Sequence, residues 1–204
     1  MRQLRPHHEI LAVEILAAFV GGIGAGGVAL HATGTPWPWA TVTMAPLTSA
    51  ALCLISAGLV LGHRARFLSL GPALLLVVSG AWAFTGMHVT ALSPWLDTER
   101  VAPATAGCLI VAGVGVGMLV HDRWWTSDIA MVCGHVLAGA SSIVLLGYLS
   151  DAPNMIQWTR EGVGMAVTTA VALGLTAIAL LVQATHCRFL PPPQPSDEGL
   201  TDDA

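Results

Sequence analysis

Residues 102–120 read APATAGCLIVAGVGVGMLV, a stretch in which no side chain carries a charge. A helix of about 20 mostly apolar residues can cross the hydrocarbon core of a bilayer. The rest of the chain holds more stretches of the same kind. Together, the predicted spans are residues 10–31, 41–62, 67–91, 102–120, 129–150 and 162–183. The sequence therefore predicts an all-α, polytopic membrane protein with six transmembrane helices.

The composition of the whole chain supports this fold class. Of its 204 residues, 10% are charged and 54% are hydrophobic, whereas soluble domains carry about 25% charged residues. So few charges cannot cover a water-facing surface, and they form no basic patch. This argues against a soluble enzyme and against nucleic-acid binding. The transmembrane domain is expected over residues 1–185. Residues 186–204 combine prolines with acidic side chains and are expected to form a disordered cytoplasmic tail.

The distribution of arginines predicts the orientation of the chain. All eight positive charges are arginines, and cytoplasmic loops of membrane proteins carry the excess of positive charge. If the N-terminus lies inside, only Arg100 and Arg160 fall on the outer side. Both termini are therefore expected in the cytoplasm. The arginines on the cytoplasmic side would be Arg2, Arg5, Arg64, Arg66, Arg123 and Arg188.

Parts of the chain match one another when the sequence is shifted by 57 residues. His31 then falls on His88 and Thr48 falls on Thr105, while a weaker third copy begins at Met165. In each copy, a Met/Val-Ala-x-x-Thr element is expected to open the second of two helices. Self-similarity of this kind is typical of tandem structural units. We therefore expect the six helices to form three tandem helical hairpins.

Part of this pattern resembles a known kind of membrane region. Residues 43–54 (TMAPLTSAALCL), 145–149 (LLGYL) and 164–170 (GMAVTTA) are similar to the repeated helices in membrane-embedded N-terminal sensor regions of bacterial histidine kinases and diguanylate cyclases. The resemblance implies a multi-pass protein of the bacterial inner membrane that senses a signal and passes it to a cytoplasmic partner. Those proteins continue into PAS, kinase or cyclase domains, whereas this sequence continues into a short tail. An input module is therefore expected.

A second resemblance concerns a shorter motif. Met87-His88-Val89-Thr90 is similar to the M-H-Y-T signature of the MHYT sensor domain, and residues 29–33 (ALHAT) look like a worn second copy. The resemblance implies repeated hairpins in which Met and His near the outer face bind copper or another ligand. The sequence departs from that signature at Val89, where the signature has Tyr, and at Leu30 in the second copy, where the signature has Met.

Two histidines are the sharpest candidates for a ligand site. His31 and His88 hold matching positions in two copies of the pattern. Facing imidazoles can ligate copper, zinc or a haem iron, and Met87 would add a soft sulfur ligand. Trp82, expected near the middle of its helix, is a further candidate for ligand contact. The alternatives are that each histidine hydrogen-bonds a backbone carbonyl or water at the interface, or that it senses pH.

A second pair of ionisable residues is predicted inside the membrane. Glu14 and His135 each lie about six residues from the cytoplasmic end of their helices, roughly 9 Å deep at 1.5 Å per residue. Ionisable groups at such a depth are costly and often functional. The two side chains could form a hydrogen-bonded pair that serves proton transfer. Alternatively, Glu14 reaches back to the lipid headgroups.

Three functions remain open from the sequence. The chain holds no nucleophile elbow, phosphate loop or HExxH motif, so a non-enzymatic protein is expected. The first hypothesis is a sensory or regulatory module in the bilayer, with a cytoplasmic signalling protein as partner and possible assembly into a homo-oligomer. The second is a haem- or copper-binding membrane subunit that uses His31 and His88. The third is a small proton-coupled transporter.

Overall fold

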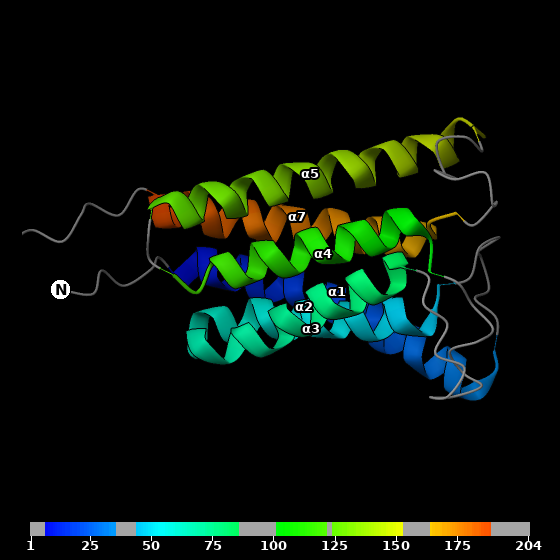
Figure 1. Cartoon of the computed structure of the whole chain (residues 1–204), viewed down its shortest axis with the longest axis horizontal. Coiled ribbons are helices and arrows are strands. Elements are labelled where there is room, and N and C mark those ends of the chain that lie inside the picture. The colour runs from blue at the N-terminus through cyan, green and yellow to red at the C-terminus, as the bar shows by residue number, and fades with distance from the viewer. Residues whose placement is uncertain (1–6, 36–43, 86–100, 122–123, 153–163, 189–204) are drawn as a thin grey trace, which may run out of the picture.

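The computed structural model describes residues 7–35, 44–85, 101–121, 124–152 and 164–188. Within these ranges the chain forms six α-helices and one short 3-10 helix, with no β-strand (Figure 1). The all-α class predicted from the sequence is therefore confirmed. The elements are α1 (His7–Thr33), α2 (Pro46–Arg64), η1 (Arg66–Ser69), α3 (Leu70–Thr85), α4 (Pro103–Met118), α5 (Trp124–Leu149) and α7 (Val167–Arg188).

The helices pack as a closed bundle. Each helix packs against the next one along the chain, and α7 returns to α1. The most extensive contacts join α1 with α2, α3 with α4, and α5 with α7. In addition, α2, α4 and α7 contact one another. We call these three the inner helices, and we call α1, α3 and α5 the outer helices.

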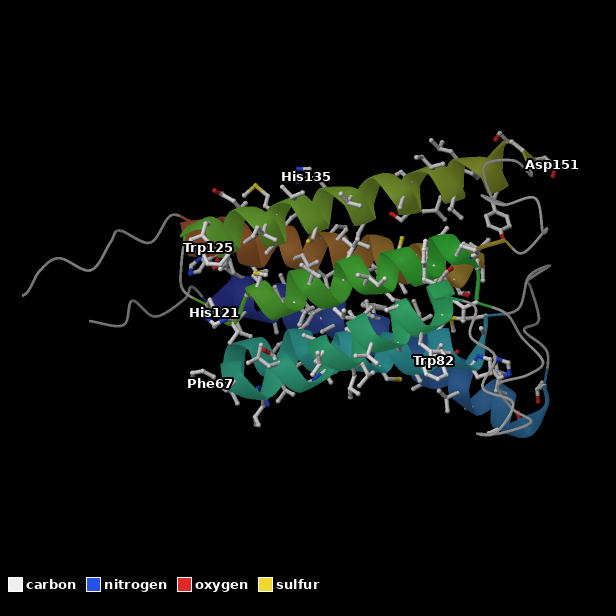
Figure 2. The ribbon with its side chains drawn as sticks, viewed as in Figure 1. Phe67, Trp82, His121, Trp125, His135 and Asp151 are labelled. Atoms are coloured by element: carbon white, nitrogen blue, oxygen red, sulfur yellow. The ribbon has the colours of Figure 1, made fainter. Side chains whose placement is uncertain are left out.

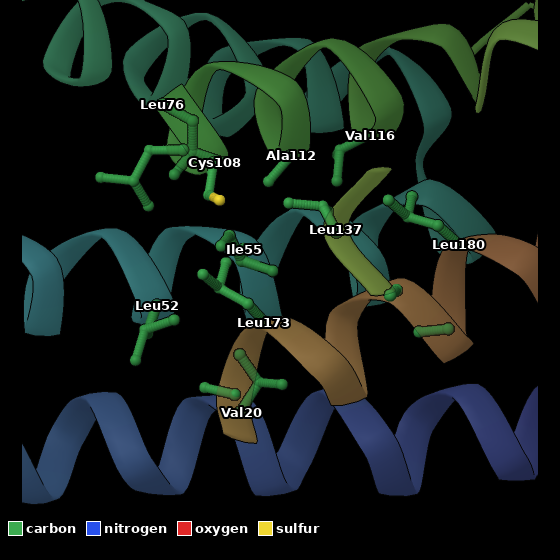
Figure 3. Packing of buried hydrophobic residues seen from close by; sticks show 14 of the residues in the cluster. Val20, Leu52, Ile55, Leu76, Cys108, Ala112, Val116, Leu137, Leu173 and Leu180 are labelled. Atoms are coloured by element: carbon green, nitrogen blue, oxygen red, sulfur yellow. The ribbon is translucent and has the colours of Figure 1, made fainter. Parts of the chain in front are cut away.

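The inner helices supply the centre of the core. Leu52 of α2, Leu109 of α4 and Leu173 of α7 are fully buried. Seven residues later, which is about two helical turns, Leu59, Val116 and Leu180 are buried as well. Figure 3 shows several of these side chains between the ribbons. Each inner helix thus presents one apolar stripe to the other two.

Small residues allow each outer helix to approach its inner partner. A Cβ atom on Gly24 would lie 2.7 Å from the carbonyl oxygen of Ser49, and one on Gly80 would lie 2.8 Å from that of Ala106. In the α5–α7 pair, a Cβ on Gly174 would lie 3.3 Å from Ser141 Oγ. Small residues at such crossings let two backbones come close, which is a common way to pack helices in membranes.

The outer surface of the bundle is apolar. Phe19, Leu74 and Val132, one from each outer helix, are each at least 62% exposed. Four helices are long and apolar enough to cross a membrane, while the apolar parts of α2 and α4 are shorter. The structure therefore supports a membrane protein, and the crossing of the bilayer by all six helices stays a prediction. The four long segments are His8–Thr33, Phe67–Phe84, Trp125–Leu149 and Val167–His186.

Several helix boundaries differ from the sequence expectation for physical reasons. α2 begins at Pro46, whose fixed φ suits the first turn, after Ala45 in an extended conformation. The stretch expected as one helix from residue 67 opens as a 3-10 turn, and α3 begins at Leu70. α7 begins at Val167, after residues 164–166, which are not helical. Conversely, α5 begins at Trp124, five residues before the apolar stretch that predicted it.

Candidate functional site

Polar contacts gather at the two ends of the bundle. One end holds the last turns of the outer helices and the first turns of the inner helices, and Figure 2 labels Trp82 and Asp151 there. We call it the His31 end. At the opposite end, which we call the Arg64 end, Figure 2 labels Phe67, His121 and Trp125. Both ends contain residues that the sequence marked as candidates.

At the His31 end, His31 connects α1 to the start of α2. Its Nε2 atom lies 2.6 Å from the carbonyl oxygen of Met44, two residues before α2 begins. Met44 is fully buried. The contact is a hydrogen bond from the ring N–H to the carbonyl, and it anchors the segment that leads into α2. It matches one of the alternatives left open by the sequence, in which His31 bonds a backbone carbonyl.

Tyr148 makes the corresponding contact between α5 and α7. Its hydroxyl donates to the carbonyl oxygen of Met165 at 2.8 Å, and Met165 also lies two residues before its helix begins. The sequence did not predict this role for Tyr148, because His and Tyr can make the same hydrogen bond although they are different residue types. A signal was nevertheless present, since both residues stand shortly before a Met-Ala-x-x-Thr element.

The helix ends that carry these two residues are alike. α1 is followed by Gly34 at φ 65° and α5 by Asp151 at φ 52°. Each of these residues lies three positions after the bonding side chain. The amide of the next residue closes the helix in the same way, from Thr35 to Leu30 at 3.0 Å and from Ala152 to Gly147 at 2.9 Å. Glycine adopts a positive φ at little cost, whereas for Asp the conformation is uncommon but tolerated.

The inner helices begin in the same way as one another. Ala45, Ala102 and Ala166 precede them, and each alanine carbonyl accepts a hydrogen bond at 3.0 Å from the amide four residues later. Two residues into each helix comes a threonine, and Thr48, Thr105 and Thr169 are 3%, 3% and 2% exposed. We call these three residues the threonine set. Each member is the last residue of a Met/Val-Ala-x-x-Thr element in the repeated sequence pattern.

The remaining residues of the predicted ligand site are only partly described. Trp82 lies in the last turn of α3 and is exposed. His88 and Met87 lie outside the described residues, so the proposed His31–His88 ligand pair stays a prediction. In the described part of the chain, no group of three or more His, Cys, Asp and Glu residues is placed to hold a metal ion.

At the Arg64 end, two ion pairs connect α1 with its neighbours. Arg64 Nη2 donates to Glu14 Oε1 at 2.9 Å, which joins α2 to α1. His186 Nδ1 lies 2.6 Å from Glu9 Oε2, which joins α7 to α1. That Glu9 oxygen makes no hydrogen bond within the described residues, so we treat the second contact as an ion pair that requires a protonated His186.

Glu14 and His135 were expected to be able to pair, and the structure does not bring them together. Glu14 instead binds Arg64, because the last turn of α2 lies beside the second turn of α1. His135 is exposed on the outer side of α5, and its Nδ1 atom lies 2.8 Å from the carbonyl of Met131 in the same helix (Figure 2). The sequence could not choose between these partners, since apolar residues surround both positions.

The described geometry thus contains a buried polar region at the His31 end and an ion-paired region at the Arg64 end, joined by continuous helices. Comparison with known proteins adds no assignment: no family model, curated protein or solved structure matches the chain.

Proposed function

We propose that this chain is a non-enzymatic sensory module of the bacterial inner membrane, built from three tandem helical hairpins that cross the bilayer six times. The two termini would lie in the cytoplasm, at the Arg64 end. A signal arriving at the His31 end would change how inner and outer helices pack. A cytoplasmic protein would read that change at the Arg64 end.

The membrane part of the proposal is supported by where polar and apolar side chains lie. Large apolar side chains cover the outer helices, as expected for a surface that faces lipid. The described ion pairs lie toward the Arg64 end, where side chains can reach the headgroups. The two helices with shorter apolar segments, α2 and α4, are inner helices, so other helices shield much of their backbone.

The observation that carries the sensory part is the matched pair of contacts at the His31 end. His31 of α1 bonds the Met44 carbonyl before α2, and Tyr148 of α5 bonds the Met165 carbonyl before α7. In two of the three hairpins, a side chain of the outer helix therefore holds the start of the inner helix. The far ends of α2 and α7 are paired with α1 through Glu14 and Glu9. Loss of such a hydrogen bond at the His31 end can therefore shift an inner helix relative to α1 at the Arg64 end. Signalling requires two such packings of similar free energy.

The proposal is tested by a distance measurement across the Arg64 end. Spin labels would be placed at the exposed positions His8 and Thr185, in a variant without native cysteines reconstituted into vesicles. His31→Phe removes the bond to Met44 and keeps a ring. We expect a changed distance distribution between the labels, measured by pulsed electron paramagnetic resonance.

A matched control lies two residues away from His31. Thr33→Val removes a hydroxyl at the same end, but among the described residues that hydroxyl bonds only within the last turn and to Thr35. It should leave the distribution unchanged. Identical distributions for the starting protein and His31→Phe would refute the proposed coupling between the two ends.

A further inference from the structure

Glu9 and His186 join the first described helix to the last one. Glu9 lies in the first turn of α1, and His186 lies in the last turn of α7, two residues before that helix ends at Arg188. The Nδ1 atom of His186 and the Oε2 atom of Glu9 are 2.6 Å apart. We call this contact the terminal clasp. It holds the end of an inner helix against the start of α1.

The terminal clasp is better shielded from water than the pair of Arg64 and Glu14. The His186 side chain is 17% exposed, whereas that of Arg64 is 68% exposed. In addition, the Oε2 atom of Glu9 is buried and accepts no hydrogen bond within the described residues. A buried carboxylate oxygen without a donor is costly. In the described part of the chain, the group placed to compensate this oxygen is a positively charged His186.

The terminal clasp therefore depends on the proton of His186. Histidine side chains ordinarily change charge between pH 5 and 8, whereas carboxylates and arginines ordinarily stay charged throughout that range. When the imidazole gives its proton to water, the attraction to Glu9 disappears and the buried oxygen is left uncompensated. The clasp is then held toward pH 5 and released toward pH 8.

Other charged and titratable groups at the Arg64 end are distinguishable from the clasp. Glu14 and Arg64 bind each other, and His8 and His121 are exposed. Asp128 lies on α5, which reaches this part of α7 through the bond from the Ser127 hydroxyl to the Ala184 carbonyl. At this end, the elements that contact α7, or the turns after them, thus carry His8, Glu9, Glu14, Arg64, His121 and Asp128 among their described side chains.

We infer that the terminal clasp is a pH-sensitive device, which fixes α7 against α1 while His186 is protonated and releases it when His186 is neutral. Because α7 is an inner helix, its release changes how the bundle packs at the Arg64 end. As a regulator of the signal that leaves this end, the clasp rests on the proposed function. As a pH-dependent contact, it stands on the packing of α1 and α7 alone.

The label pair at His8 and Thr185 reads the clasp directly, because these exposed positions adjoin Glu9 and His186. Labelling also removes the imidazole of His8. The full chain is reconstituted into vesicles with the same buffer on both sides, and label distances are measured by pulsed electron paramagnetic resonance. We expect a narrow distribution at about pH 5.5 and a distribution that extends to longer distances at about pH 8.

Three substitutions assign that response to the clasp. His186→Gln and Glu9→Gln each remove one of its charges, so both variants should show the longer distances at both pH values. His186→Arg keeps a positive charge across the range and should show the shorter distances at both. A purely structural role of the imidazole ring would not give opposite results for Gln and Arg.

His121→Gln is the matched control, because it removes an exposed histidine at the same end. It should keep the pH response of the starting protein. Circular dichroism at both pH values checks folding, and if one glutamine variant does not fold, the other decides. The inference is overturned if the starting protein gives the same distribution at both pH values. It is also overturned if the response persists in the folded glutamine variants.

The clasp and the proposed function fail separately. The clasp is tested by changing the pH with His31 in place, whereas the coupling between the two ends is tested by His31→Phe at a single pH.

Discussion

Replacing Gly24 by alanine should destabilise the bundle, although alanine is the better helix former. A Cβ at this position would lie 2.7 Å from the Ser49 carbonyl oxygen and 2.9 Å from the Cys53 amide nitrogen. Both atoms belong to the backbone of α2, so neither can rotate away. α1 and α2 would have to separate by several tenths of an ångström, and the contacts on both sides of the crossing would loosen.

The magnitude follows from comparison with Gly22, two residues earlier in the same helix. A Cβ on Gly22 would meet nothing within 4 Å. Both substitutions gain the same helix propensity, about 1 kcal/mol, so it cancels between them. The difference is then the cost of overpacking, typically about 1–3 kcal/mol. Gly22→Ala should be neutral or stabilising, and Gly24→Ala should be less stable than Gly22→Ala by about 1–3 kcal/mol.

The assay is reversible unfolding in mixed micelles, with the SDS fraction raised stepwise and helix content followed by circular dichroism. The two variants are compared at equal protein concentration with the starting protein. If Gly24→Ala unfolds at the same SDS fraction as Gly22→Ala, or at a higher one, then α1 and α2 do not approach each other as closely at Gly24 as we infer.

Three further predictions use other contacts. Tyr148→Phe removes the bond to the Met165 carbonyl and should cost about 1 kcal/mol in the same unfolding assay, and an unchanged midpoint would contradict the bond. Because the Arg64 side chain is 68% exposed and that of Glu14 32% exposed, a double-mutant cycle on this pair should give a coupling below about 1 kcal/mol; a larger value would place the pair away from water. For the proposed topology, single cysteines at Thr35 and Arg64 in intact cells should react with a membrane-impermeant maleimide only at Thr35, and labelling of both or of Arg64 alone would contradict the orientation.

Much of the helix content followed from the sequence, because long apolar stretches between charged or proline-containing joints leave few alternatives. The stretch at residues 102–120 lies within two residues of α4 at each end. The boundary of α7 was less accurate. Its apolar stretch begins before the helix does, and hydropathy does not distinguish the non-helical residues 164–166 from the helix that follows them.

The polar contacts were harder to predict for a different reason. In a chain whose helices are apolar on all faces, periodicity does not tell which face meets which neighbour. The partner of Glu14 is therefore decided by the placement of α2 beside α1, which no local pattern encodes. The equivalence of His31 and Tyr148 could not be read from the sequence, because a backbone carbonyl can accept a hydrogen bond from any donor side chain of suitable length. Residue identity is not constrained at such a position, whereas geometry is.

The crossings between outer and inner helices have a consequence for how such a chain can diverge. Between α1 and α2 the outer helix supplies the close glycine, Gly24, whereas both helices supply one in the other two pairs: Gly80 and Gly113 between α3 and α4, and Gly134 and Gly174 between α5 and α7. What selection can preserve there is the combined volume of two facing side chains, and either partner is free to change if the other compensates. Relatives of this chain would then keep the sum at each crossing while individual alignment columns drift.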